Sequence, residues 1–301
     1  MPIWIPIAVA AALFQCWRTA KQQKLRDVLS VNGAGFVRYV YGAPMALALL
    51  VVALVVTGSG LPVVTPMLIV WCIASGLGQI LATNLLIMSF GYRNFAVGTA
   101  YSKTDTVQSA ILALIVLHEA LLPLAWIGMG VGLCGVVTLS LAGRGVGARE
   151  LLAAAFQPAA VCGLGAGFLF AFTTVFIKLA NQSVQGVPLV VGALFILVVT
   201  NTLQTTMQGA WLALREPQQL RKAFTTWRSS MGVGTLSACG SACWFTGFAL
   251  AEVALVRSVG QIEIVFTLLF SRFYLKETVK RGDAAGLVLV VLGVLLILIA
   301  S

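Results

Sequence analysis

Charged residues are scarce in this sequence. Only 9% of its 301 residues are Asp, Glu, Lys or Arg, whereas about 25% are charged in a typical soluble domain. Hydrophobic residues make up 60% of the chain, and the mean hydropathy is +1.01. So few charges cannot cover so large an apolar core, which excludes a soluble globular fold and requires lipid around most of the chain.

Acidic residues and histidine are scarce as well. Nine acidic residues stand against nineteen basic ones, with one histidine and a net charge of +10. We interpret the basic excess as loops at the cytoplasmic leaflet, so we expect membrane lipids and not nucleic acid as partners. No Walker lysine loop, nucleotide site or metal motif occurs, so we expect no cofactor, no metal and no enzymatic activity.

Long apolar runs fill most of the chain. A helical span needs about 20 mostly apolar residues, and these runs are too long and continuous for barrel strands. We therefore predict an all-α integral membrane protein, with a surface loop or short interfacial helix at residues 211–229. The predicted spans lie at residues 3–19, 33–57, 63–90, 93–117, 121–142, 154–180, 186–212, 230–250, 252–272 and 281–300.

Basic residues divide unevenly between the predicted loops. The loops after the first, third, fifth, seventh and ninth spans hold fifteen of the nineteen Lys and Arg residues. The positive-inside rule then places these loops in the cytoplasm and both termini outside.

The second half of the chain resembles the first at a shift of 158 residues. The aligned pairs are Phe90 with Phe248, Asp105 with Glu263, Glu119 with Glu277, Gly128 with Gly286, and Gly135 with Gly293. Five spans in each half would give the halves opposite orientations. We therefore predict two inverted five-helix repeats, residues 1–146 and 147–301, in one membrane domain, an arrangement typical of secondary transporters. Chance similarity between two apolar strings is the alternative.

Two opposite charges lie in one predicted span. A Lys or Asp at the centre of a span costs about 2.5–3.5 kcal/mol on insertion scales, so such residues usually face a cavity or a partner. Lys103 and Asp105 are two positions apart, and on a continuous helix they would point about 200° away from each other. We expect one to line a transport path and the other to pair with a neighbouring helix.

The span at residues 252–272 offers partners for both charges. In the repeat it is equivalent to the span that carries Lys103 and Asp105. We predict the ion pairs Lys103–Glu263 and Asp105–Arg257. Our hypothesis is that Lys103 and Arg257 bind the anionic end of a substrate, while Asp105 or Glu263 binds an amine or a coupling proton. The alternative is an ion-pair clamp that only holds the helices together.

Further polar residues in the spans are candidates for substrate binding. They are Tyr101, Gln261, Gln15, Gln79, Asn84 and Trp244. The amides could instead form hydrogen bonds between helices, and the tryptophan could be an interface anchor.

Each half ends in a glutamate, a short loop and a glycine-rich span. The residues are His118, Glu119, Gly128, Gly132 and Gly135 in the first half, and Lys276, Glu277, Gly286 and Gly293 in the second. In this pattern the chain resembles the drug/metabolite transporter superfamily, EamA type. The resemblance implies a ten-helix carrier, often an exporter of amino acids and other small metabolites, with a central cavity and both termini in the cytoplasm. A helix cap or turn is the plainer interpretation of His118 and Glu119.

We therefore expect a monomeric secondary transporter in the bacterial inner membrane. It would move a small polar metabolite by alternating access, with protons as a candidate coupling ion. Mixed charges in the spans favour amino acids as substrates, with nucleobases, sugars or cationic drugs as alternatives. An intramembrane transferase and a channel are the competing functions, although clustered acids and a ring of like charge are both missing from the sequence.

Overall fold

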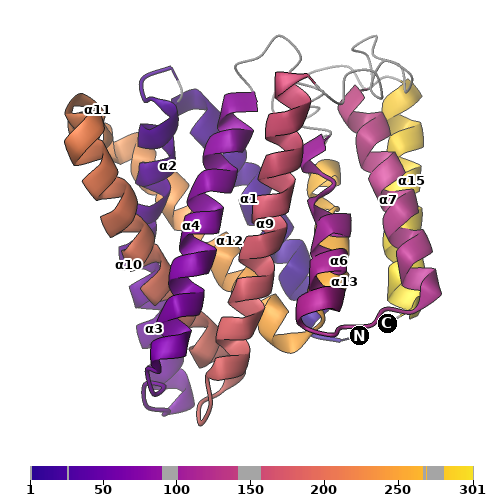
Figure 1. The fold of residues 1–301 in the computed structure, drawn as a ribbon, viewed down its shortest axis with the longest axis horizontal. Helices are drawn as coiled ribbons and strands as arrows, with labels where there is room; N and C mark the ends of the chain where they lie inside the picture. The colour runs from indigo at the N-terminus through magenta and orange to yellow at the C-terminus, as the bar shows by residue number, and fades with distance from the viewer. Residues whose placement is uncertain are drawn as a thin grey trace. The chain divides into compact units, whose positions relative to one another are not determined.

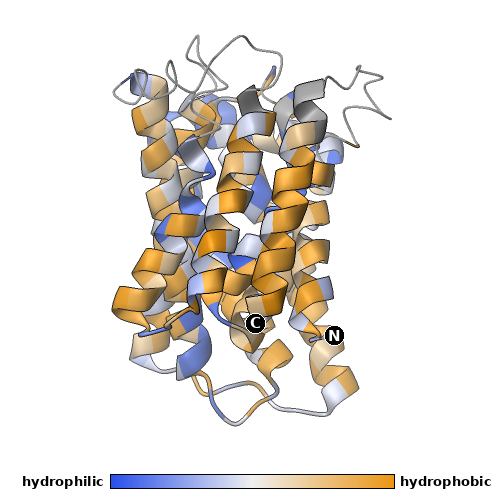
Figure 2. Cartoon of the chain, turned by 90° about the vertical axis from the view of Figure 1, so that its right-hand side faces the viewer, coloured by the Kyte–Doolittle hydropathy of each residue, from blue (hydrophilic) through white to orange (hydrophobic). Residues whose placement is uncertain are grey.

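The computed structural model describes residues 2–25, 27–89, 101–141, 157–266, 269 and 281–300. All regular elements within these ranges are α-helices (Figure 1), which confirms the predicted all-α class. Figure 2 shows hydrophobic residues along most of the length of the helices, with hydrophilic residues interspersed. The helices long and apolar enough to cross a membrane are Val31–Thr57, Pro66–Ser89, Pro158–Ser183, Leu189–Arg215 and Trp227–Leu250.

These five stretches support a multi-pass membrane protein. Three shorter apolar helices accompany them, at Asp105–Val116, Pro123–Leu139 and Ala285–Ala300. The total of ten spans and their inverted order stay predictions.

The first of two compact units comprises residues 1–80 and 176–251. Within it, α1 packs along α12, and α10 packs against α3. Its helices are α1 (Trp4–Leu25), α2 (Val31–Val40), α3 (Gly42–Thr57), α10 (Leu189–Arg215), α11 (Pro217–Thr225) and α12 (Trp227–Leu250), with the start of α4 (Pro66–Ser89) and the end of α9 (Pro158–Ser183).

The short helix α11 confirms the short helix foreseen at residues 211–229. Glu216, directly before α11, accepts hydrogen bonds from the side chains of Ser30 and Asn32, each at 2.6 Å. These contacts attach α11 to the start of α2, where Ser30 is also the N-cap residue.

The second compact unit comprises residues 81–175 and 252–301. Its helices are α6 (Asp105–Val116), α7 (Pro123–Leu141), α13 (Val253–Gly260) and α15 (Arg281–Ala300), with the end of α4 and the start of α9. Here α7 packs along α15, and α6 packs against α13. Each unit thus combines segments from both halves of the chain, and the division into repeats 1–146 and 147–301 stays a prediction.

Three predicted spans are not single regular helices. The span at 33–57 is two helices that meet at Tyr41. The span at 93–117 has a turn at residues 103–104, before α6 begins, and the span at 252–272 has a turn at residues 261–262, after α13 ends. Continuous hydropathy therefore overestimated the regularity of these segments, because it does not register local hydrogen bonds that interrupt a helix.

Glycines bring α7 and α15 into close contact. A Cβ at Gly128 would lie 2.9 Å from the Gly293 carbonyl oxygen, and one at Gly135 would lie 2.8 Å from the Gly286 carbonyl oxygen. The helix backbones therefore touch without intervening side chains, as small residues allow in membrane proteins.

We predict that Gly135→Ala destabilises the protein, because its Cβ would lie 2.6 Å from the Val290 backbone nitrogen. Overpacking of this kind typically costs about 1–3 kcal/mol. The matched control is Gly130→Ala on the same helix, where a Cβ would meet nothing within 4 Å. Melting of the purified variants in detergent would measure the effect, and equal melting temperatures would contradict the close contact.

Candidate functional site

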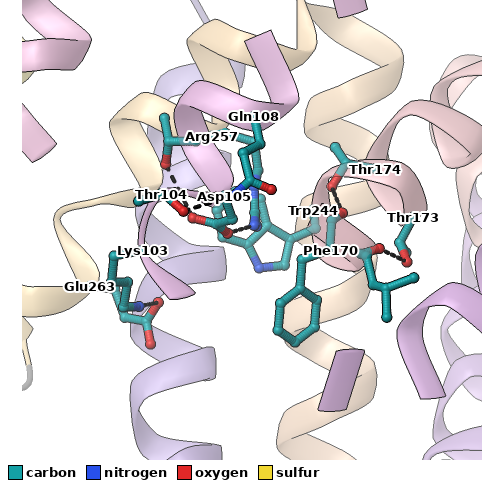
Figure 3. A network of polar contacts seen from close by, with 12 residues as sticks. Lys103, Thr104, Asp105, Gln108, Phe170, Thr173, Thr174, Trp244, Arg257 and Glu263 are labelled. Atoms are coloured by element: carbon teal, nitrogen blue, oxygen red, sulfur yellow. Dashed lines mark hydrogen bonds and ion pairs between the residues drawn. The ribbon is translucent and has the colours of Figure 1, made fainter. Parts of the chain in front are cut away.

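Two ion pairs connect the segment around α6 with the segment around α13 in the second unit. The Lys103 Nζ lies 3.2 Å from the Glu263 Oε2, and the Arg257 guanidinium binds the Asp105 carboxylate. Figure 3 shows each basic side chain directed toward its acidic partner. Both predicted ion pairs are thereby confirmed, whereas a role of these four residues in binding substrate stays a prediction.

Lys103 and Asp105 both reach the same neighbouring segment, which corrects our expectation that they would point in opposite directions. That expectation assumed a continuous helix. Residues 101–102 are helical, residues 103–104 form a turn, and α6 begins at Asp105. Because a turn separates the two charges, the rotation of 100° per residue of a continuous helix does not apply to them.

Thr104 organises this turn. Its hydroxyl donates to the Tyr101 carbonyl at 2.6 Å, and its backbone N–H donates to the same carbonyl at 3.2 Å. Gln108, one turn into α6, donates from Nε2 to the Thr104 hydroxyl at 2.8 Å. A hydroxyl that bonds to the backbone in this way competes with helical hydrogen bonds, which explains the interruption.

The second turn has the same position in the other half of the chain. Residues 103–104 become residues 261–262 at the shift of 158 that aligns the two halves. At the second turn the N–H groups of Gln261 and Ile262 bond to carbonyls three residues earlier, at 3.1 Å each. Two segments that the shift of 158 residues aligns are therefore interrupted at matching positions, and Lys103 and Glu263 lie at these interruptions.

Glycines face both turns. A Cβ at Gly167 in α9 would lie 3.1 Å from the Ser102 carbonyl oxygen and 3.4 Å from the Asp105 nitrogen. A Cβ at Gly132 in α7 would lie 2.4 Å from the Gln261 Oε1. Gly132 therefore provides the space for the Gln261 side chain.

The four charges are largely shielded and sum to zero. The exposed fractions of the side chains are 29% for Lys103, 14% for Glu263, 12% for Arg257 and 15% for Asp105. Charges removed from water are tolerated only when they are paired with good geometry. Each of the four meets that condition through a partner on the opposite segment.

Glu119 holds the beginning of α13. Its Oε2 accepts a hydrogen bond of 2.9 Å from the Val253 backbone N–H, in the first turn of that helix. A carboxylate is favourable there, because the N-terminus of a helix carries partial positive charge. His118 has a φ of 56°, in the left-handed region, and ends the segment that follows α6. The helix cap or turn considered for these two residues is thus confirmed, while Lys276 and Glu277 lie outside the described residues.

Three further sequence candidates, Gln15, Gln79 and Trp244, form hydrogen bonds between helices in the first unit. The Trp244 Nε1 donates to the Gln15 Oε1 at 3.0 Å, and the Gln79 Oε1 accepts from the Gln204 Nε2 at 2.8 Å. Trp244 is only 8% exposed, which does not fit an interface anchor. These contacts are those expected from the alternative of interhelical bonding, so a substrate role for these residues stays a prediction, as it does for Asn84 and Tyr101.

The sequence analysis missed a polar row on α10. Thr200, Gln204 and Gln208 are all buried, and the Gln208 Nε2 donates to the Asn32 carbonyl at 3.1 Å. Their spacing of four residues was visible in the sequence and places them on one helix face. Among the described residues, no three His, Cys, Asp or Glu side chains lie close enough together to hold a metal ion.

We predict that Arg257→Met lowers thermal stability, because it leaves the Asp105 carboxylate shielded and unpaired. Loss of one partner of a buried pair typically costs about 3–5 kcal/mol. Adding Asp105→Leu in a double variant should recover most of the loss, because it removes the unpaired charge. Melting in detergent would measure both variants, and a double variant no more stable than Arg257→Met would contradict the pairing.

Comparison with known proteins finds a family match in the second half of the chain. Residues 157–299 match the model of the EamA-like transporter family, and no curated protein matches the chain. Among 28 matching chains of solved structures, one crystal structure gives a TM-score of 0.75 over 99% of this chain and 97% of its own, at 16% identity. That likeness shows the fold alone. Over residues 157–299, the chain is therefore similar to the EamA-like transporter family, part of the drug/metabolite transporter superfamily.

Proposed function

We propose that the protein is a secondary carrier that exports small polar metabolites, amino acids foremost, across the cell membrane by alternating access. The observation that carries this proposal is the pair of ion bridges at two equivalent helix interruptions, Lys103–Glu263 and Arg257–Asp105. Transporters commonly bind substrates and coupling ions where helices are discontinuous near the middle of the membrane. The match of residues 157–299 to the model of a transporter family supports the same class.

The glycine contacts of α7 and α15 support an inverted repeat. Gly128 approaches Gly293, and Gly135 approaches Gly286. In the alignment of the two halves, Gly128 is equivalent to Gly286 and Gly135 to Gly293. Contacts exchanged in this way between equivalent residues are the pattern that a two-fold axis produces. Such an axis in the membrane plane is the basis of alternating access in many carriers.

The charges at the turns favour a substrate that carries both signs. The two ion pairs comprise two cations and two anions, with no excess of either sign. A substrate with a single charge would leave one protein charge without a partner, which is costly away from water. An amino acid brings an ammonium and a carboxylate together, so it can satisfy charges of both signs.

We predict saturable counterflow of amino acids in proteoliposomes that contain the protein. Vesicles loaded with unlabelled amino acids would accumulate labelled ones, and Lys103→Ala would abolish the exchange without lowering the folded yield. A clamp without a transport role predicts instead that yield and exchange fall together. Folded wild-type protein that exchanges no amino-acid pool would contradict the substrate class, and the same assay would then be run with nucleobases, sugars and cations.

A further inference from the structure

The two ion pairs differ in how firmly the backbone holds them. Asp105 lies in the first turn of α6, and Arg257 lies one turn into α13, after the start that Glu119 caps. Lys103 lies in the turn before α6, and Glu263 is, like Asp105, the first helical residue after a turn. The two pairs therefore differ in the basic residue, because Arg257 lies within a regular helix and Lys103 lies in a turn.

The exposed fractions also differ only at the basic residue. The Lys103 side chain is 29% exposed, against 12% for Arg257, whereas the two acidic side chains are alike at 14% for Glu263 and 15% for Asp105. A lysine ammonium is a compact charge on a flexible stem, whereas an arginine guanidinium suits a fixed pair. Of the two pairs, Lys103–Glu263 therefore has the more exposed and more flexible cation.

An unused hydrogen-bond donor lies beside this pair in the sequence. Gln261 is two residues before Glu263, and its side chain is 9% exposed. Its Nε2 is buried and donates to no hydrogen-bond acceptor among the described residues. The Gln261 Oε1 occupies the space that Gly132 leaves open. A buried donor without an acceptor is unfavourable, and a ligand carboxylate would satisfy it.

We propose that the zwitterionic end of an α-amino acid replaces the Lys103–Glu263 pair, an inference that rests on the proposed carrier function. The substrate carboxylate binds the Lys103 ammonium and the Gln261 Nε2, and the substrate ammonium binds the Glu263 carboxylate. The Arg257–Asp105 pair stays closed and holds the two segments together. One internal ion pair is exchanged for two with the ligand, so every charge has a partner before and after binding. An amine alone would pair with Glu263 and leave Lys103 unpaired. A carboxylate alone would pair with Lys103 and leave Glu263 unpaired.

The test compares an amino acid with its two singly charged analogues. For leucine, these are isopentylamine, which lacks the carboxylate, and 4-methylpentanoate, which lacks the ammonium. Inhibition of amino-acid counterflow would be measured for all three compounds, using the amino acid that the wild type exchanges best and its own pair of analogues. In the wild type, we expect each analogue to inhibit at least about 10-fold more weakly than the amino acid, a factor that corresponds to one lost charge contact.

Neutral variants should then change selectivity in opposite directions. Glu263→Gln should bind the amino acid about 10-fold more weakly but retain the carboxylate analogue, because only the ammonium partner is lost. Lys103→Gln should also bind the amino acid more weakly but retain the amine analogue, because only the carboxylate partner is lost. Arg257→Gln is the matched control. It should weaken inhibition by all three compounds equally, or it should lower the folded yield.

The contrary outcomes are distinct. If Glu263→Gln and Lys103→Gln each weakened inhibition by all three compounds equally, the assignment would be overturned. The same would follow if Arg257→Gln weakened inhibition by one analogue and not by the other. A wild type that exchanges no amino acid would overturn the proposed function and this inference with it. If the single variants do not fold, the exchanged pair Lys103→Glu with Glu263→Lys should restore folded yield but not transport. Restored transport in that variant would show that the pair is only a clamp.

Discussion

Charges inside a lipid-embedded protein have to be paired, and this constraint shapes the second unit. Lys103, Asp105, Arg257 and Glu263 lie on two segments that hydropathy alone places in the membrane. Each has a partner of opposite sign on the other segment. Pairing reduces the large penalty for removing charges from water. The arrangement also makes each segment depend on the other, because moving one segment alone would separate two ion pairs.

The interruptions in the helices allow this pairing. On a continuous helix, Lys103 and Asp105 could not both face α13, since they would diverge by about 200°. The turn organised by Thr104 lies between them, and the turn at residues 261–262 lies between Arg257 and Glu263. Gly167 and Gly132 leave space beside the two turns. Helix interruption, glycine placement and charge pairing are therefore parts of one arrangement.

The sequence was sufficient for the features that depend on composition and pattern. Low charge and long apolar runs predicted a helical membrane protein, and the shift of 158 residues led from Lys103 and Asp105 to their partners Glu263 and Arg257. The turns were not predictable from hydropathy, because it does not register local hydrogen bonds such as that of the Thr104 hydroxyl to the Tyr101 carbonyl. The role of Glu119 at Val253 was also hidden, since the contact joins residues 134 positions apart. The buried row on α10 was missed although its spacing was visible.

The cap at α13 gives the shared glutamate motif a physical meaning. Glu119 binds the start of a helix from the other half of the chain, and that helix carries Arg257. Glu119, one of the residues that carry the family resemblance, therefore contributes to the position of the helix that bears Arg257.

The most direct test of the account is the infrared signature of the acidic side chains when an amino acid binds. Protein containing ¹³C-carboxyl-labelled glutamate, and separately labelled aspartate, would be measured with and without the amino acid that it exchanges. We expect a shift in the glutamate carboxylate band that is lost in Glu263→Gln, and an unchanged aspartate band. A shift confined to aspartate, or one that persists in Glu263→Gln, would contradict opening of the Lys103–Glu263 pair by the substrate.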